Sequence, residues 1–106
     1  MNYKEFREYR IKNEVELDRS ANTLLILEDY GADSLVFAEA YEGLLKQKLE
    51  YLRVAIKFFD DMYKNSFWFM KPLVAKRLRR LAFEHSITVH NLVVATMYRK
   101  QQQPKA

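Results

Sequence analysis

The chain has 106 residues, of which 49% are hydrophobic and 30% are charged, and its formal net charge is +4. This composition is typical of one folded domain and too apolar for a disordered chain, and two Gly and two Pro provide too few turns for an all-β fold. The absence of Cys excludes a disulfide scaffold and a thiol nucleophile, and with two His a metal site would need carboxylates to complete it. We therefore expect an all-α protein that carries no metal and no cofactor.

The first half of the chain predicts a long helical hairpin in residues 1–64. Residues 3–29 have apolar side chains at helical spacing, as one helix or as two if Asp18 or Ser20 caps a second. Tyr30-Gly31-Ala32 fits the end of this segment, and Asp33 or Ser34 fits the N-cap of the next helix.

Residues 35–64 predict a second helix, about 45 Å long at 1.5 Å per residue. Its apolar stripe is wide: it includes Phe37, Tyr41, Leu45, Leu52, Ile56, Phe59 and Tyr63. One antiparallel helix cannot cover such a stripe, so either a four-helix bundle or a dimer must supply the remaining contacts. We expect a homodimer, with residues 1–64 serving oligomerisation or partner binding.

Four large apolar residues, Phe67, Trp68, Phe69 and Met70, follow the second helix. Because Pro72 disfavours helical geometry in the residue before it, residues 66–71 form either a short strand or an apolar linker. The four side chains are a candidate partner-binding site, since Trp and Phe often dominate protein interfaces. Filling of a core or dimer interface, stacking on unpaired bases and contact with a membrane interface are the alternatives.

The remaining residues predict a basic helical module over 65–106. Pro72 suits the first turn of a helix that runs to about residue 85. Ser86-Ile87 then reads as a short connection, and Thr88 as the N-cap of a last helix that frays into a flexible tail from about residue 101. The whole chain therefore reads as a helical hairpin followed by a short helix-turn-helix-like pair.

Charge is distributed unevenly along the chain. Residues 1–34 carry five bases and eight acids, whereas residues 65–106 carry eight bases and one acid, Glu84. A segment this basic attracts polyanions such as nucleic acid, although a solvated surface with a basic tail is the alternative. The candidate nucleic-acid-binding residues are Lys76, Arg77, Arg79, Arg80, Thr88, His90, Asn91, Arg99 and Lys100.

Residues 66–100 resemble the ribbon-helix-helix module of the Arc/MetJ type. The matching features are the candidate strand Ser66–Lys71, the helix Pro72–His85 with the apolar pair Leu81-Ala82, and the start Thr88-Val89-His90-Asn91. The resemblance implies a dimer whose paired strands enter the DNA major groove and whose last helix binds a phosphate with its N-terminal amides.

We therefore expect a small, non-enzymatic DNA-binding regulator of transcription that acts as a dimer on double-stranded DNA or another nucleic acid. A helical adaptor or inhibitor that docks on a protein through residues 67–70 is the second hypothesis. The third is a ribonuclease, because Arg80 and His85 match the R-x4-H spacing of the HEPN family. The charged start MNYKEFREYR has no signal-peptide character, and the longest uncharged run, Ser86 to Tyr98, is too short to span a bilayer. We expect a cytoplasmic protein.

Overall fold

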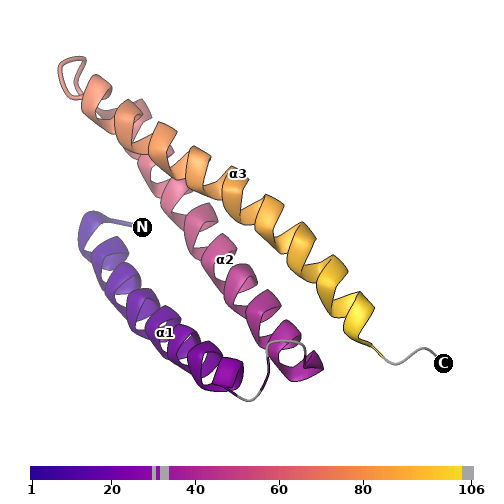
Figure 1. Ribbon diagram of the computed structural model, residues 1–106. Helices are drawn as coiled ribbons and strands as arrows, with labels where there is room; N and C mark the ends of the chain where they lie inside the picture. The colour runs from indigo at the N-terminus through magenta and orange to yellow at the C-terminus, as the bar shows by residue number, and fades with distance from the viewer. Residues whose placement is uncertain (30, 32–33, 104–106) are drawn as a thin grey trace.

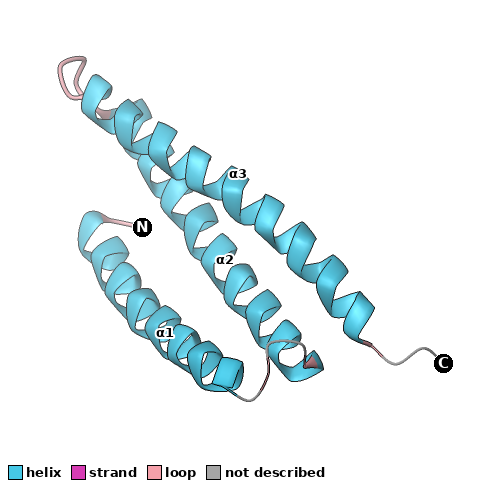
Figure 2. Cartoon of the chain, in the orientation of Figure 1, coloured by secondary structure: helices cyan, strands magenta, loops and turns pink. Residues whose placement is uncertain are grey.

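The structure, a computed structural model, describes residues 1–29, 31 and 34–103. These residues form three α-helices, α1 (Tyr3–Asp29), α2 (Leu35–Asn65) and α3 (Lys71–Gln102). The described part of the chain contains no strand (Figure 2). The prediction of an all-α protein is confirmed.

Helix α2 lies between the other two helices. Figure 1 shows α1 along one side of α2 and α3 along another, each antiparallel to it. Helix α2 packs on both, and more extensively on α3, whereas no Cα atom of α1 lies within 8 Å of a Cα atom of α3. The molecule is elongated, with extents of 57 × 23 × 20 Å. The wide apolar stripe of α2 thus has two partners within the chain, not the single partner that a hairpin alone would provide.

The core is the place where all three helices meet. Phe6 of α1 and Leu81 of α3 join Leu52, Ala55 and Phe58 of α2 in one buried cluster. The Phe6 ring, only 2% exposed, stacks on the Phe58 ring with 4.3 Å between centroids and 4° between planes. Ala55 is 0% exposed, and its small side chain leaves room for the neighbouring helices. Burial of each large side chain contributes about 1.5–3 kcal/mol, so this cluster supplies much of the stability.

The ends of the helices follow local sequence signals. The Ser34 hydroxyl accepts a hydrogen bond from the Phe37 amide at 3.0 Å, which confirms Ser34 as the N-cap of α2. Gly31, two residues beyond the end of α1, has φ +120°, a conformation that favours glycine. Pro72 lies in the first turn of α3 as predicted. The described residues do not include Tyr30 and Ala32 of the predicted helix end, Asp33, the alternative N-cap, or residues 104–106 of the predicted tail.

Residues 66–70 form a tight connection and not the alternative short strand. The amides of Met70 and Lys71 both donate to the Phe67 carbonyl, at 2.9 and 3.2 Å. In a strand these amides would donate to a neighbouring strand, whereas here they donate to a carbonyl within the turn. The linker interpretation of this segment is therefore the one that the structure supports.

Helix α3 is one continuous helix, so the predicted connection at Ser86-Ile87 is wrong. Its buried residues Val74, Leu81, Thr88 and Ala95 recur every seven positions through that segment. The Thr88 hydroxyl donates to the Glu84 carbonyl at 2.7 Å, which is the bond of a threonine inside a helix and not of an N-cap. With neither Gly nor Pro between Pro72 and Pro104, nothing interrupts the helix. Residues 3–29 likewise form one helix, without a second start at Asp18 or Ser20.

The Phe6 stack predicts that substituting a buried phenylalanine lowers the free energy of unfolding far more than substituting an exposed one. Phe6→Ala should lower the free energy of unfolding by about 3–5 kcal/mol, because it removes a buried ring and leaves a cavity. Phe67→Ala, the same change at an exposed position, should alter it by less than about 0.5 kcal/mol. Urea unfolding followed by circular dichroism measures both values. Equal effects of the two substitutions would contradict the packing described.

Candidate functional site

Three cations lie together on the outer side of α3, the side turned away from α2. Lys76, Arg79 and Arg80 are all exposed, whereas Val74 and Leu81 on the opposite side are buried. Their spacing of three and four residues places them on one side of the helix. None of the three makes an ion pair with a described residue. We call Lys76, Arg79 and Arg80 the outer basic face.

Arg77 borders the outer basic face on the side toward α2, and it lines a surface hollow with Lys76 and Arg80. Its guanidinium lies over the Phe59 ring of α2, 5.5 Å from the ring centroid. Lys71 makes a similar contact with Tyr63 of α2, at 5.3 Å. Such cation–π contacts hold the charge against the bundle. Arg77 therefore lies beside α2, although the sequence grouped it with its basic neighbours.

Arg99 is the clearest exception among the predicted phosphate-binding residues. Its guanidinium donates to the Glu42 carboxylate of α2, which also pairs with Lys46 at 2.8 Å. The Glu42 side chain is only 8% exposed. Hydrogen bonds from Lys46 and then Arg99 lower the pKa of Glu42 below its ordinary value. Arg99 thus joins α3 to α2, and Lys100 is the exposed cation at this end of α3.

The predicted phosphate-binding helix start at Thr88 is absent, because these residues lie in the middle of α3. Inside a helix the amides are bonded to carbonyls four residues earlier and cannot bind a ligand. Thr88 is buried at 2% exposure, Asn91 is half-buried and His90 is exposed. The strand and two-helix arrangement implied by the ribbon-helix-helix resemblance is likewise not seen in residues 66–102.

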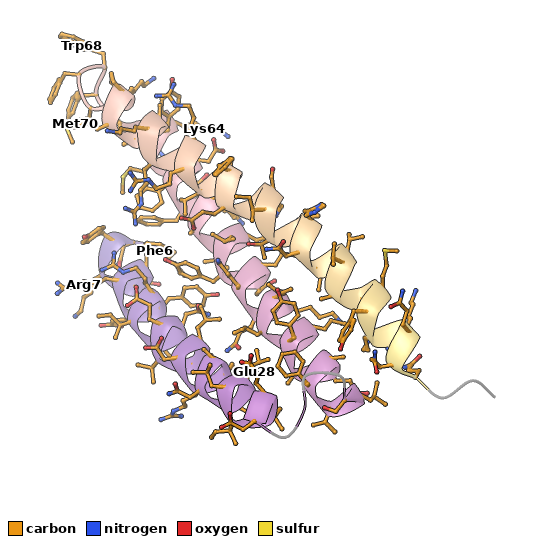
Figure 3. All side chains as sticks on the ribbon, in the orientation of Figure 1. Phe6, Arg7, Glu28, Lys64, Trp68 and Met70 are labelled. Carbon is orange, nitrogen blue, oxygen red and sulfur yellow. The ribbon has the colours of Figure 1, made fainter. Side chains whose placement is uncertain are left out.

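An exposed group of large apolar side chains lies at the end of the molecule where α2 connects to α3 (Figure 3). Trp68 is 82% exposed, and Phe67 and Phe69 are also exposed. The rings order one another: Phe67 stacks on Phe69 at 5.8 Å, and Trp68 meets Phe69 edge-on at 5.9 Å. We call Phe67–Met70 the aromatic tip. It is not part of the core of this chain, which excludes core filling as its role within one copy.

A groove between α1 and α3 contains two arginines that the sequence interpretation missed. Arg7 and Arg10 of α1 line it opposite Arg77 of α3. Burial raises the pKa of the Tyr51 hydroxyl on α2; the charges of Arg10 and Arg77 oppose this effect, and those of Glu14 and Glu84 add to it. The sequence interpretation missed this pair because residues 1–34 carry more acids than bases. Their spacing of three residues, directly after Phe6, was the available signal.

The Arg80–His85 pair of the ribonuclease hypothesis lies within α3. Arg80 and His85 are five residues apart on one helix and therefore point about 140° away from each other. Within the described ranges, no three His, Asp or Glu residues gather closely enough to hold a metal ion. No helix in this part of the chain combines the length and apolarity that are needed to cross a membrane.

Comparison of the chain with protein-family models, with curated proteins and with solved structures gave no match. The candidate site therefore depends on the geometry alone.

The Glu42 contacts predict a pH-dependent contribution to stability. Because the folded-state pKa of Glu42 lies below its unfolded value, the charged carboxylate stabilises the fold above pH 4.5, and this contribution is lost as the pH falls through the folded-state pKa. Glu42→Gln should lower the free energy of unfolding by about 1–3 kcal/mol at pH 7, and by progressively less below pH 4.5. Urea unfolding of both proteins over a pH series measures this.

Asp60→Asn is the control, because Asp60 pairs with Lys64 at 3.0 Å in an exposed position where solvent screens the charges. This substitution should leave the unfolding midpoint nearly unchanged. A Glu42→Gln penalty as large at pH 3 as at pH 7 would contradict the assigned role of the carboxylate.

Proposed function

We propose that the protein is a small, non-enzymatic nucleic-acid-binding protein that contacts the phosphates of duplex DNA through the outer basic face. The observation that carries the proposal is that Lys76, Arg79 and Arg80 are exposed on one side of α3 without a carboxylate partner among the described residues. Unpaired cations attract phosphates and release condensed counterions when they bind them.

The rigidity of the helix supports this function. Lys76 and Arg80 are separated by one helical turn, about 6 Å along the axis. A continuous helix holds them in place before binding, so less conformational entropy is lost when phosphates are contacted. Contacts of this kind position a protein on DNA and read no bases. The proposed binding is therefore largely independent of sequence.

We also propose that two copies act together. Three phosphate contacts from one chain give weak binding at physiological salt, and a dimer would double their number. Exposed apolar side chains on the outer side of α3, beyond the outer basic face, favour such pairing; they are Phe83, Ile87, Val94 and Met97. Their helical spacing forms a stripe that a second helix could cover.

Salt dependence tests the DNA-binding proposal. Binding to a short labelled duplex, measured by fluorescence anisotropy over a series of NaCl concentrations, should weaken with a slope of about −0.9 per phosphate contacted in a plot of log affinity against log salt. The triple variant Lys76→Gln, Arg79→Gln, Arg80→Gln should lose most of the affinity and reduce this slope by about 3 per chain.

The control is Arg19→Gln, which removes an exposed arginine from α1 and should leave the slope unchanged. Light scattering on the same samples gives the number of chains per complex. Binding that is insensitive to salt, or that survives the triple substitution, would refute the proposal.

The aromatic tip favours a second candidate function, docking on a protein. A tryptophan that is 82% exposed at the end of a helical bundle resembles the anchor residues of protein interfaces. Trp68→Ala should abolish a specific complex in a pull-down and leave DNA affinity and the circular dichroism spectrum unchanged. Loss of DNA affinity in this variant would instead assign the tip to nucleic-acid binding.

A further inference from the structure

The groove between α1 and α3 has the properties of a small-molecule site, independently of the proposed DNA binding. It has a volume of about 290 Å³, which is at the lower end of the range for ligand pockets. Both outer helices line it, and Phe59 of α2 contributes to it as well. Figure 3 shows Phe6 and Arg7 at the start of α1, with the Phe6 side chain directed toward α2.

The polar side chains of the groove are mainly cationic. Arg7, Arg10 and Arg77 line it, and no Asp or Glu is among the described residues that do. The Nε atom of Arg10 is buried and makes no hydrogen bond, although it forms a long ion pair with the Glu14 carboxylate at 3.9 Å. A buried donor without an acceptor costs free energy, and cations placed together repel one another. An anion in the groove would relieve both costs.

The rest of the groove is apolar. Phe6, Phe59 and Val74 line it, and Arg77 covers the Phe59 ring. A simple inorganic anion would satisfy the arginines and leave this surface in contact with water. A ligand with an acidic head and a short apolar chain would match both parts.

We propose that this groove binds a small amphiphilic anion, with the acidic head held by Arg7, Arg10 and Arg77 and the apolar chain against Phe6 and Phe59. The site adjoins the outer basic face at Arg77, which also lines a hollow with Lys76 and Arg80, but its other two arginines lie on α1. Its ligand would connect α1 to α3, two helices whose Cα atoms are nowhere within 8 Å of each other.

Octanoate is the probe for the test, with acetate and 1-octanol as controls that carry only the acidic head or only the apolar chain. The Nε–H signals of the arginines in a ¹H–¹⁵N NMR titration report the contact directly. Octanoate should shift the Arg10 and Arg77 signals saturably, and the two controls should produce no saturable shift at equal concentration. Equal shifts with acetate, or equally tight binding of 1-octanol, would overturn the proposal.

Arg10→Gln and Arg77→Gln should each weaken octanoate binding about tenfold, the effect of losing one hydrogen bond to a charged group. Arg19→Gln on α1 is the matched control outside the groove, and it should bind octanoate as the unaltered protein does. Circular dichroism confirms that each variant is folded. Should Arg77→Gln fail to fold, Arg10→Gln decides the question, because Arg10, unlike Arg77, lies over no aromatic ring of the described residues. Unaltered octanoate affinity in folded Arg10→Gln would refute the site, whatever the DNA affinity is.

Discussion

The burial of the Phe6 ring against Phe58 is the contact on which the arrangement of this protein depends. It fixes the first turns of α1 on the middle helix, close to the point where Leu81 of α3 enters the same cluster. Helices α1 and α3 have no Cα atoms within 8 Å of each other, and both pack on α2. The Phe6 stack therefore also helps to set the position of Arg7 and Arg10 opposite Arg77 across the groove.

Much of the fold could be predicted because the signals are local. Apolar side chains at spacings of three and four mark the helices, and Ser34 and Pro72 mark two helix starts correctly. The prediction that α3 is divided into two helices was wrong for a related reason. Ser86 and Thr88 are residues that favour caps, but a cap forms only when the chain leaves the helix. The buried repeat from Val74 to Ala95 is the longer-range pattern that keeps α3 intact.

The candidate site was harder to predict than the fold. A basic segment reveals the sign of its charge but not the direction of each side chain, and successive residues on a helix point about 100° apart. Lys76 and Arg77 are neighbours in sequence and both are exposed, yet Arg77 lies over the Phe59 ring and Lys76 lies on the side of α3 turned away from α2. Arg99 donates to Glu42, which lies 57 residues earlier in the sequence, so its charge is already paired. No local pattern indicates which cation meets a carboxylate on another helix.

The central position of α2 makes the three helices unequal in how firmly they are held. Helix α3 packs on α2 over the larger contact and is joined to it by the Arg99–Glu42 pair. Helix α1 has the smaller contact, and its apolar seam is interrupted by Asn13, whose buried side-chain oxygen has no hydrogen-bond partner. Elements held by fewer buried contacts open at lower free energy than the rest of a fold. We therefore expect the α2–α3 pair to persist and α1 to separate first when the protein begins to unfold.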